Sequence, residues 1–289
     1  MSKLAAVTSI TGSQSRAIAR AFQDRGYAVR GLSRKQAEAR GVECVAVDPN
    51  SAEDMARALS GVDVAVFTSP IDYRDGVRER LAEAFVGGAA KAGVRRVLFN
   101  PAAAVIENHD RPVSVSLRAV REIVLGGGVE AAAIQPTVYM DNLAEPWAAP
   151  SIVNEGVLAY PMPEDAPVSW ISHASLGAFA AAAAEADLSG GRIFDVGGPE
   201  ALTGPQVAAI LSRHVGREVR YMTLDLGVFG AALNQAYGPP VGDHIADLYR
   251  LMATDKRIME RDAGAYARLG VKPETFDAWA ARQTWPSAS

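Results

Sequence analysis

Short apolar runs alternate with longer amphipathic stretches along the first half of the chain. The apolar runs predict strands, and apolar positions spaced three and four apart predict helices between them. The strands are expected at residues 4–8, 27–32, 42–47, 64–68, 96–99 and 130–134. A first helix is expected through Ile18, Ala21 and Phe22 to Gly26, and further helices at residues 51–59, 76–93 and 116–125. Strands that alternate with helices in this way form a parallel sheet covered on both faces, and right-handed crossovers make it doubly wound. The predicted fold class is therefore α/β, with a Rossmann-type sheet.

After Pro136 this alternation stops. Five prolines, at positions 146, 150, 161, 163 and 167, mark a long irregular stretch before a helix that is predicted from residue 174. Later patterns predict strands at 191–196 and 218–223 and helices at 203–215 and 240–262. We therefore expect a dinucleotide-binding core over residues 1–136. Residues 137–289 are expected to form mainly a smaller C-terminal substrate lobe, with strands that return to the sheet.

Composition and charge narrow the classes of partner. Of the 289 residues, 49% are hydrophobic and the net charge is −4, which is typical of a folded globular protein and offers no basic surface for nucleic acid. No apolar stretch reaches the ~20 residues that cross a membrane. The single cysteine, Cys44, excludes an internal disulfide and fits a reducing, cytoplasmic compartment. We expect a small-molecule partner and a monomer or homodimer.

The turn after the first predicted strand is a candidate phosphate-binding loop. In doubly wound folds this turn holds a pyrophosphate at a helix N-terminus, commonly through a G-x-x-G-x-x-G motif. Here the segment reads Ser9-Ile-Thr-Gly12-Ser-Gln-Ser15, so that only the central glycine of the motif is present. Serine is small enough to be accommodated at both other positions, but it adds bulk where none is usual, and we expect reduced affinity.

Selectivity between NAD and NADP is determined at the end of the second strand. An acidic residue there would bind the ribose hydroxyls, whereas basic residues would bind a 2'-phosphate. The sequence has Ser33, Arg34 and Lys35, and no carboxylate until Glu38. A guanidinium group binds phosphate well. The expected cofactor is therefore NADP(H).

With these segments placed, the chain resembles the NmrA-like group of atypical short-chain dehydrogenases/reductases almost from end to end. The stretches that carry the resemblance are the loop above, GVECVAVDPNSAEDMARALSGVDVAVFTSP from residue 41, AAKAGVRRVLF from 89, QPTVYMDNL from 135, GVLAYPMPEDAPVSWIS from 156 and GPEALTGPQVAAILSRHVGREVRYMTL from 198. The resemblance implies that cofactor contacts come from Thr11, Gly12, Gln14 and Ser15 at the pyrophosphate, Arg34 and Lys35 at the 2'-phosphate, Asp48 at the adenine, and Thr68, Ser69 and Pro70 at the nicotinamide ribose. It also implies that residues 139–170 form a wall of the substrate pocket.

The catalytic pair typical of this superfamily is missing. Typical reductases use a tyrosine as the acid and a lysine four residues later, but none of the eight tyrosines here is followed by lysine or arginine at that spacing. Where relatives keep an active-site serine, the chain reads Asn100-Pro-Ala-Ala, and Arg118 lies near the position of the usual lysine. Arg118 could hold the ribose but cannot transfer a proton.

Four other polar side chains are candidates for the pocket. Asn100 ends a central strand, where it could donate to a substrate oxygen or cap the turn. Tyr139 and Tyr160 could act as acids or simply pack, and His173 could protonate a substrate or be structural. Asn100 and Tyr139 are the tentative catalytic residues, and the expected substrate contacts are Tyr139, Tyr160, Trp170 and His173. The four histidines share no metal-ligand spacing, so no metal is expected.

These features favour an atypical NADPH-dependent reductase of a ketone or enone in a fairly large apolar substrate, such as the polyketide-like substrates of natural-product tailoring enzymes. Hydride transfer depends mainly on positioning, and the proton can come from water. Two alternatives stay open. One is a non-catalytic NADP-binding redox sensor, and the other is a cofactor-independent isomerase, dehydratase or cyclase on a reductase fold.

Overall fold

The computed structural model describes residues 3–254 and 263–285. The chain divides into two compact units, which are described separately below. The first, here the sheet unit, comprises Met1–Pro136, His173–Val196 and Asp262–Val271. The second unit comprises Thr137–Ser172, Gly197–Arg261 and Lys272–Ser289. In the described residues no helix is long and apolar enough to cross a membrane.

The sheet unit is built on a seven-stranded parallel sheet in the order β3-β2-β1-β4-β5-β6-β8. Its strands are β1 (Leu4–Thr8), β2 (Ala28–Ser33), β3 (Glu43–Ala46), β4 (Val64–Thr68), β5 (Arg96–Asn100), β6 (Glu130–Pro136) and β8 (Ile193–Val196). Every residue of β4 and β5 is buried, as expected for strands that are covered on both faces. The predicted doubly wound α/β class is confirmed.

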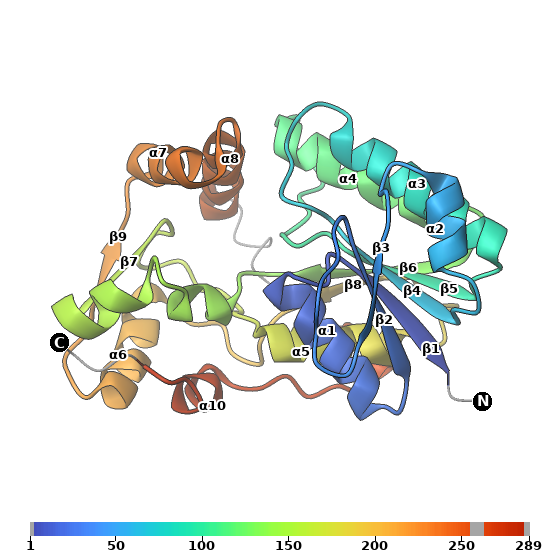
Figure 1. Cartoon of the computed structure of the whole chain (residues 1–289). Helices are drawn as coiled ribbons and strands as arrows, with labels where there is room; N and C mark the ends of the chain where they lie inside the picture. The colour runs from blue at the N-terminus through green and yellow to red at the C-terminus, as the bar shows by residue number, and fades with distance from the viewer. Residues whose placement is uncertain (1–2, 255–262, 286–289) are drawn as a thin grey trace. The chain divides into compact units, whose positions relative to one another are not determined.

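Six helices belong to this unit in the described part of the chain. They are α1 (Ser13–Asp24), α2 (Ala52–Ala58), α3 (Val77–Ala92), α4 (Pro112–Gly126), α5 (His173–Ala183) and α9 (Ala263–Leu269). Figure 1 shows α2, α3 and α4 on one face of the sheet and α1 and α5 on the other. The core on the first face is aromatic, with the Phe67 ring packed 5.2 Å from Phe85 and 6.1 Å from Phe99.

Helix α4 begins four residues earlier than residue 116, where the apolar pattern placed its start. Pro112 is its first residue. Proline has no N–H and a fixed φ, which suits the first position of a helix. The four residues before Ser116 add Val113 to the buried face, at 0% exposure. The extension places the first turn of α4 closer along the chain to the end of β5.

The second unit contains a two-stranded parallel sheet, β7 (Val157–Tyr160) paired with β9 (Arg220–Thr223). Its helices are α6 (Gly204–Val215), α7 (Leu226–Tyr237), α8 (Val241–Thr254) and α10 (Phe276–Ala281), with short helical turns η1 (Met140–Ala144) and η2 (Ser151–Glu155). β7 and α7 were not predicted from the sequence. Helix α8 confirms the predicted helix from residue 240 as far as Thr254, and the rest of that prediction lies outside the described residues.

The contact between α1 and α5 depends on Gly177. A β-carbon at Gly177 would lie 2.6 Å from the carbonyl oxygen of Ala17 on α1. That atom belongs to the backbone, so it cannot move aside without shifting the helix. Gly177 therefore sets how closely the two helices approach on this face of the sheet.

We expect Gly177→Ala to lower the free energy of unfolding by about 1–3 kcal/mol because it overpacks the α1–α5 contact. Gly126→Ala is the matched control, since Gly126 ends α4 and a β-carbon added there would meet no other atom within 4 Å. This control should leave stability unchanged or raise it by up to about 1 kcal/mol. Urea denaturation measures both, and equal stability of the two variants would contradict the role given to Gly177.

Candidate nucleotide-binding site

The turn from β1 into α1 lies at the carboxyl end of the parallel sheet. Ile10 in this turn is buried at 1% exposure and packs over Gly31 of β2, where a β-carbon would lie 2.5 Å from the Ile10 side chain. Gly12 is the N-cap of α1, and its N–H donates to the carbonyl of Ser9 at 2.8 Å. The first-turn N–H groups of a helix point out of its N-terminus and attract anions.

Gly12 itself adopts an ordinary extended conformation, with φ −79° and ψ 148°. A β-carbon here would lie 3.3 Å from the Ser9 carbonyl oxygen, a tight contact that a larger residue would relieve only by a small shift of the Ser9 backbone. The φ angle of Gly12 therefore does not require glycine, whereas the packing favours it. The missing side chain leaves the helix N-terminus open, which is the feature that allows a backbone to approach a phosphate.

Ser9 occupies the first glycine position of the loop in a left-handed conformation, with φ 55°. Ala102, after β5, is a second non-glycine residue with positive φ, at 61°. Such conformations cost roughly 1–2 kcal/mol for residues with a β-carbon. Both strained residues follow a strand end at the same edge of the sheet.

Ser15 makes a structural hydrogen bond that the sequence did not predict. Its side chain is buried at 1% exposure, and its hydroxyl bonds Thr68 Oγ1 at 3.2 Å. Thr68 in turn donates its N–H to Thr8 Oγ1 at 2.9 Å. The Ser15 hydroxyl therefore connects α1 to the end of β4, and a contact between Ser15 and a pyrophosphate stays a prediction.

Asn100 is fixed by two neighbours. Its Oδ1 accepts the N–H of Ala102 at 3.0 Å, and its Nδ2 donates to Gln14 Oε1 at 2.9 Å. The side chain is 1% exposed. It therefore caps the turn after β5 and orients Gln14 of the candidate pyrophosphate loop, so a direct catalytic role for Asn100 would require these bonds to rearrange.

Arg34 and Lys35 follow β2 and are exposed. Within residues 3–254 and 263–285, neither side chain makes a hydrogen bond or ion pair. Arg34 lines an open hollow of about 490 Å³ together with residues 46–50, which include the end of β3. Asp48 lies in the same hollow, where its Oδ1 accepts the N–H of Asn50 at 3.0 Å. An arginine that lines a hollow without a carboxylate partner, followed directly by a lysine, fits the 2'-phosphate of NADP.

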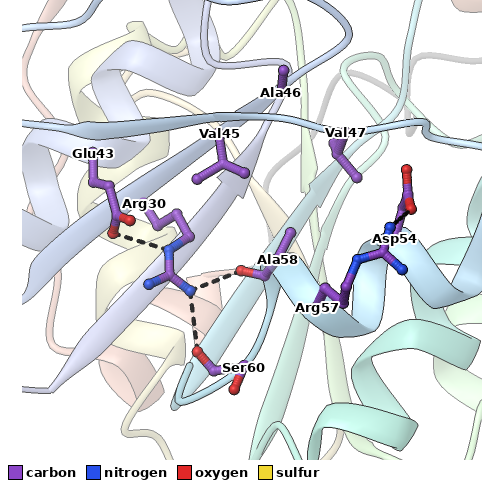
Figure 2. A pocket seen from close by; sticks show the side chains of 9 residues that line it. All are labelled: Arg30, Glu43, Val45, Ala46, Val47, Asp54, Arg57, Ala58 and Ser60. Carbon is purple, nitrogen blue, oxygen red and sulfur yellow. Dashed lines mark hydrogen bonds and ion pairs between the residues drawn. The ribbon is translucent and has the colours of Figure 1, made fainter.

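A second hollow of about 430 Å³ lies between β3 and α2 (Figure 2). Its charged groups already have partners. Arg30 bonds Glu43 Oε2 at 3.0 Å and the carbonyl oxygens of Ala58 at 2.8 Å and Ser60 at 3.1 Å, and Arg57 pairs with Asp54. The charged groups that line this hollow therefore stabilise the packing of strand and helix, and we do not consider the hollow a candidate for ligand binding.

Arg118 makes hydrogen bonds to the backbone of its own neighbourhood. Its guanidinium donates to the backbone carbonyls of Ile106 and His109, which belong to the loop between β5 and α4. The same loop is held by Arg121, which bonds Glu107 Oε2 at 3.0 Å. Arg121 also holds the pKa of the Glu107 carboxyl below its usual value. These two arginines order the loop after β5.

The candidate substrate residues are mostly in the second unit. The rings of Tyr160 and Trp170 meet edge to face at 5.0 Å, and Tyr160 Oη lies 2.6 Å from Tyr249 Oη. Burial raises the pKa of Tyr160 to about 12 and raises the pKa of Tyr139 well above its usual value. His173 is buried at the start of α5, in the sheet unit. Tyrosines with raised pKa values are weaker acids than usual, which gives them little advantage as proton donors.

Among the described residues, no three histidine, cysteine, aspartate or glutamate side chains are grouped so that they could hold a metal ion. Among the polar groups that the sheet unit offers are helix N-termini, hydroxyls and arginines. These groups suit anionic ligands.

The doubly wound sheet and the glycine turn at the start of α1 define a Rossmann-type α/β protein with a candidate dinucleotide site. The chain belongs to the NmrA-like family, whose model matches residues 1–280. The resemblance seen in the sequence is thereby confirmed.

Two curated relatives are reductases. The (4-alkanoyl-5-oxo-2,5-dihydrofuran-3-yl)methyl phosphate reductase of Streptomyces griseus is 34% identical over 242 residues, which cover 82% of this chain and 83% of the relative. The NAD(P)H azoreductase of Xenophilus azovorans is 29% identical over 253 residues, covering 85% of this chain and 86% of the relative.

Solved structures with the same fold are more distant in sequence. The NADPH-dependent quinone oxidoreductase QOR2 of Escherichia coli, complexed with NADPH, has a TM-score of 0.74 at 20% identity and covers 96% of this chain and 98% of its own. The triphenylmethane reductase of Citrobacter sp., complexed with NADP(H), has a TM-score of 0.77 at 18% identity and covers 98% and 99%. At this identity the likeness establishes the fold alone.

Replacing Ser9 tests the strain in the turn. We expect Ser9→Gly to raise the free energy of unfolding by about 1 kcal/mol, because glycine adopts positive φ without the cost that serine pays and the entropy of the unfolded chain offsets part of the gain. Thermal or urea denaturation measures the change. Ser13→Gly, at the first position of α1, is the control and should destabilise by up to about 1 kcal/mol. A loss of stability in Ser9→Gly would show that Ser9 is unstrained.

Proposed function

We propose that the chain is an NADPH-dependent reductase of a ketone or enone. The observation that carries the cofactor assignment is the pair Arg34 and Lys35, which follows β2. Neither cationic side chain has a partner among the described residues, and Arg34 lines the hollow. The open helix N-terminus at Gly12 supports a pyrophosphate position on the same edge of the sheet. The two reductases among the relatives support the reaction class.

An enone is the better match to the missing acid. The name of the Streptomyces griseus relative describes an unsaturated lactone with an alkanoyl group on the ring. When bound, NADPH supplies a hydride. In such a substrate the hydride adds to the ring carbon that bears the phosphorylated methyl group, and the C=C bond becomes a single bond. The adjacent carbon, between two carbonyl groups, then takes a proton from water, giving the saturated lactone and NADP⁺.

This chemistry removes the need for a Tyr-x-x-x-Lys pair. The negative charge that develops is delocalised over two carbonyl oxygens, so no strong general acid is required. A general acid typically contributes about 10²–10⁴-fold to a rate. The work left to the protein is to position the substrate and exclude competing reactions.

The test combines binding with turnover. Calorimetry should show micromolar binding of NADPH and weaker binding of NADH. Oxidation of NADPH, followed by its absorbance, should then accelerate with conjugated carbonyl compounds. One of them is the unsaturated lactone phosphate in the name of the Streptomyces griseus relative, here called the butenolide phosphate. Binding without turnover of any carbonyl substrate would favour the redox-sensor alternative. Absence of binding would overturn the proposal and favour a cofactor-independent enzyme.

Removing one cation tests the selectivity for NADPH. We expect Arg34→Gln to weaken NADPH binding by about tenfold or more, because a charge-assisted contact to the 2'-phosphate is lost. NADH binding should change less than twofold, since NADH has no phosphate at that position. Arg20→Gln is the control, because Arg20 is an exposed arginine of α1 that pairs with Asp24 at 2.9 Å. An equal effect of Arg34→Gln on both nucleotides would contradict the assignment.

A further inference from the structure

Arg78 is a buried arginine without a hydrogen-bonding partner in the described residues. It is the second residue of α3 and is 3% exposed. Its guanidinium carbon lies 4.5 Å from the centre of the Tyr73 ring, in the loop that leads into the helix. The side chain therefore extends toward the N-terminal end of α3. Within the described residues it also makes no ion pair.

The other buried arginines of the sheet unit are fully paired. Arg96, at 5% exposure, bonds Glu130 at 2.7 and 2.9 Å and the carbonyls of Ala183 and Ala186 at 2.8 Å each. Arg121, at 6% exposure, bonds Glu107, Glu122 and Gln135. A buried charge without such partners is costly. Arg78 is therefore an exception within its own unit.

The nearest carboxylates do not satisfy Arg78. Asp72 pairs with Arg74 at 2.6 Å, and Glu79 accepts a hydrogen bond from the Ser116 hydroxyl. Burial lowers the pKa of the Arg78 guanidinium, although Tyr73, Glu79 and Asp72 oppose this shift through space. Neither of these carboxylates forms an ion pair with Arg78 in the described residues.

Other unpartnered polar atoms lie in the same part of the fold. In the described part of the sheet unit, the buried side-chain atoms with no hydrogen-bond partner are Ser69 Oγ, Glu79 Oε2 and Ser114 Oγ. Ser69 directly follows β4, Glu79 is in the first turn of α3, and Ser114 is in the first turn of α4. The Ser116–Glu79 hydrogen bond connects the N-terminal parts of these two helices. Buried polar groups normally have partners, so a cluster of exceptions indicates a ligand.

We propose that the first turns of α3 and α4 bind an oxyanion group of the substrate, foremost a phosphate ester, with Arg78 as its cationic anchor. Guanidinium, hydroxyl donors and a helix N-terminus are the groups that bind phosphate. Glu79 Oε2 is an acceptor, which a hydroxyl of the ligand or a protonated phosphate oxygen can satisfy. The proposal rests on the proposed reductase function, which it extends to an anionic class of substrate.

Direct binding is the first test, and its probe is inorganic phosphate in a phosphate-free buffer. The protein is first saturated with NADPH, so that the positions of the cofactor's own phosphates are filled. Calorimetry should then show millimolar phosphate binding to the wild type and to Arg80→Gln, in which an exposed arginine of the same helix is removed. Arg78→Gln should lose this binding. Equal binding by all three proteins would overturn the proposal.

The second test measures turnover, and it distinguishes a phosphate of the substrate from a phosphate of the cofactor. The substrates are the butenolide phosphate and the corresponding alcohol without phosphate. Arg78→Gln should raise the KM for the phosphate by about 10- to 100-fold, the effect of losing a charge-assisted pair, and should change the KM for the alcohol less than twofold. NADPH affinity should be unchanged. A parallel loss of NADPH binding would assign Arg78 to a phosphate of the cofactor and overturn the substrate assignment.

Two measures keep the outcomes separable. If Arg78→Gln does not fold by circular dichroism, Arg78→Lys keeps the charge and should retain part of the phosphate binding, whereas complete retention of affinity would contradict a bidentate anchor. If the wild type fails to bind NADPH, the reductase proposal fails. Phosphate binding to the cofactor-free protein, compared between wild type and Arg78→Gln, still decides whether Arg78 holds an anion.

Discussion

The parallel pairing of β1 with both β2 and β4 determines where chemistry can occur in the sheet unit. All strands of a parallel sheet end at the same edge. The sheet continues from β1 through β2 in one direction and through β4 in the other, so the connections that leave β1 and β4 run in opposite directions along the sheet. The loops after β1 and β4 therefore meet at one place. Thr8, Ser15 and Thr68 join these loops through hydroxyl and backbone hydrogen bonds. The position of the helix N-terminus at Gly12 follows from this arrangement.

Strained backbone conformations and buried polar atoms without partners lie at this same edge of the sheet. Ser9 and Ala102 have positive φ, and buried polar atoms of Ser69, Glu79 and Ser114 lack partners in the described structure. Elsewhere in the unit, buried charges such as Arg96 have carboxylate and carbonyl partners. Strain and unpaired polar groups reduce stability, and they persist where a ligand supplies the missing contacts. This distribution is an argument for function that does not depend on any motif.

The sequence was informative where local pattern and tertiary environment agree. The predicted strand at residues 64–68 matches β4 because its run of mainly apolar residues is buried on both faces. The capping-box helix at Thr203 was also predictable, since Gln206 provides the reciprocal hydrogen bond. β7 and α7 lacked such signals. β7 is a four-residue strand among prolines, and α7 contains glycine and asparagine, which weaken the helical pattern.

The site was less predictable than the fold because its geometry depends on long-range contacts. Sequence alone could place Ser15 in a phosphate loop, but its hydroxyl bonds Thr68, 53 residues away. The sequence allowed Asn100 either to contact the substrate or to cap the turn after its strand. Its hydrogen bond from the Ala102 N–H is a turn-capping bond. Arg78 gave no signal, because an arginine on an amphipathic helix is normally solvated. Its burial could be recognised only once α3 was packed on the sheet.

In the proposed reductase, the missing tyrosine and lysine and the unpaired Arg78 have a common explanation. An enzyme that holds its substrate by a charged group at a distance from the reacting carbon can fix the orientation of that carbon without a polar contact beside it. A conjugated dicarbonyl substrate then takes its proton from water. Binding energy at the first turns of α3 and α4 would thus replace the acid that typical members of the superfamily place next to the carbonyl.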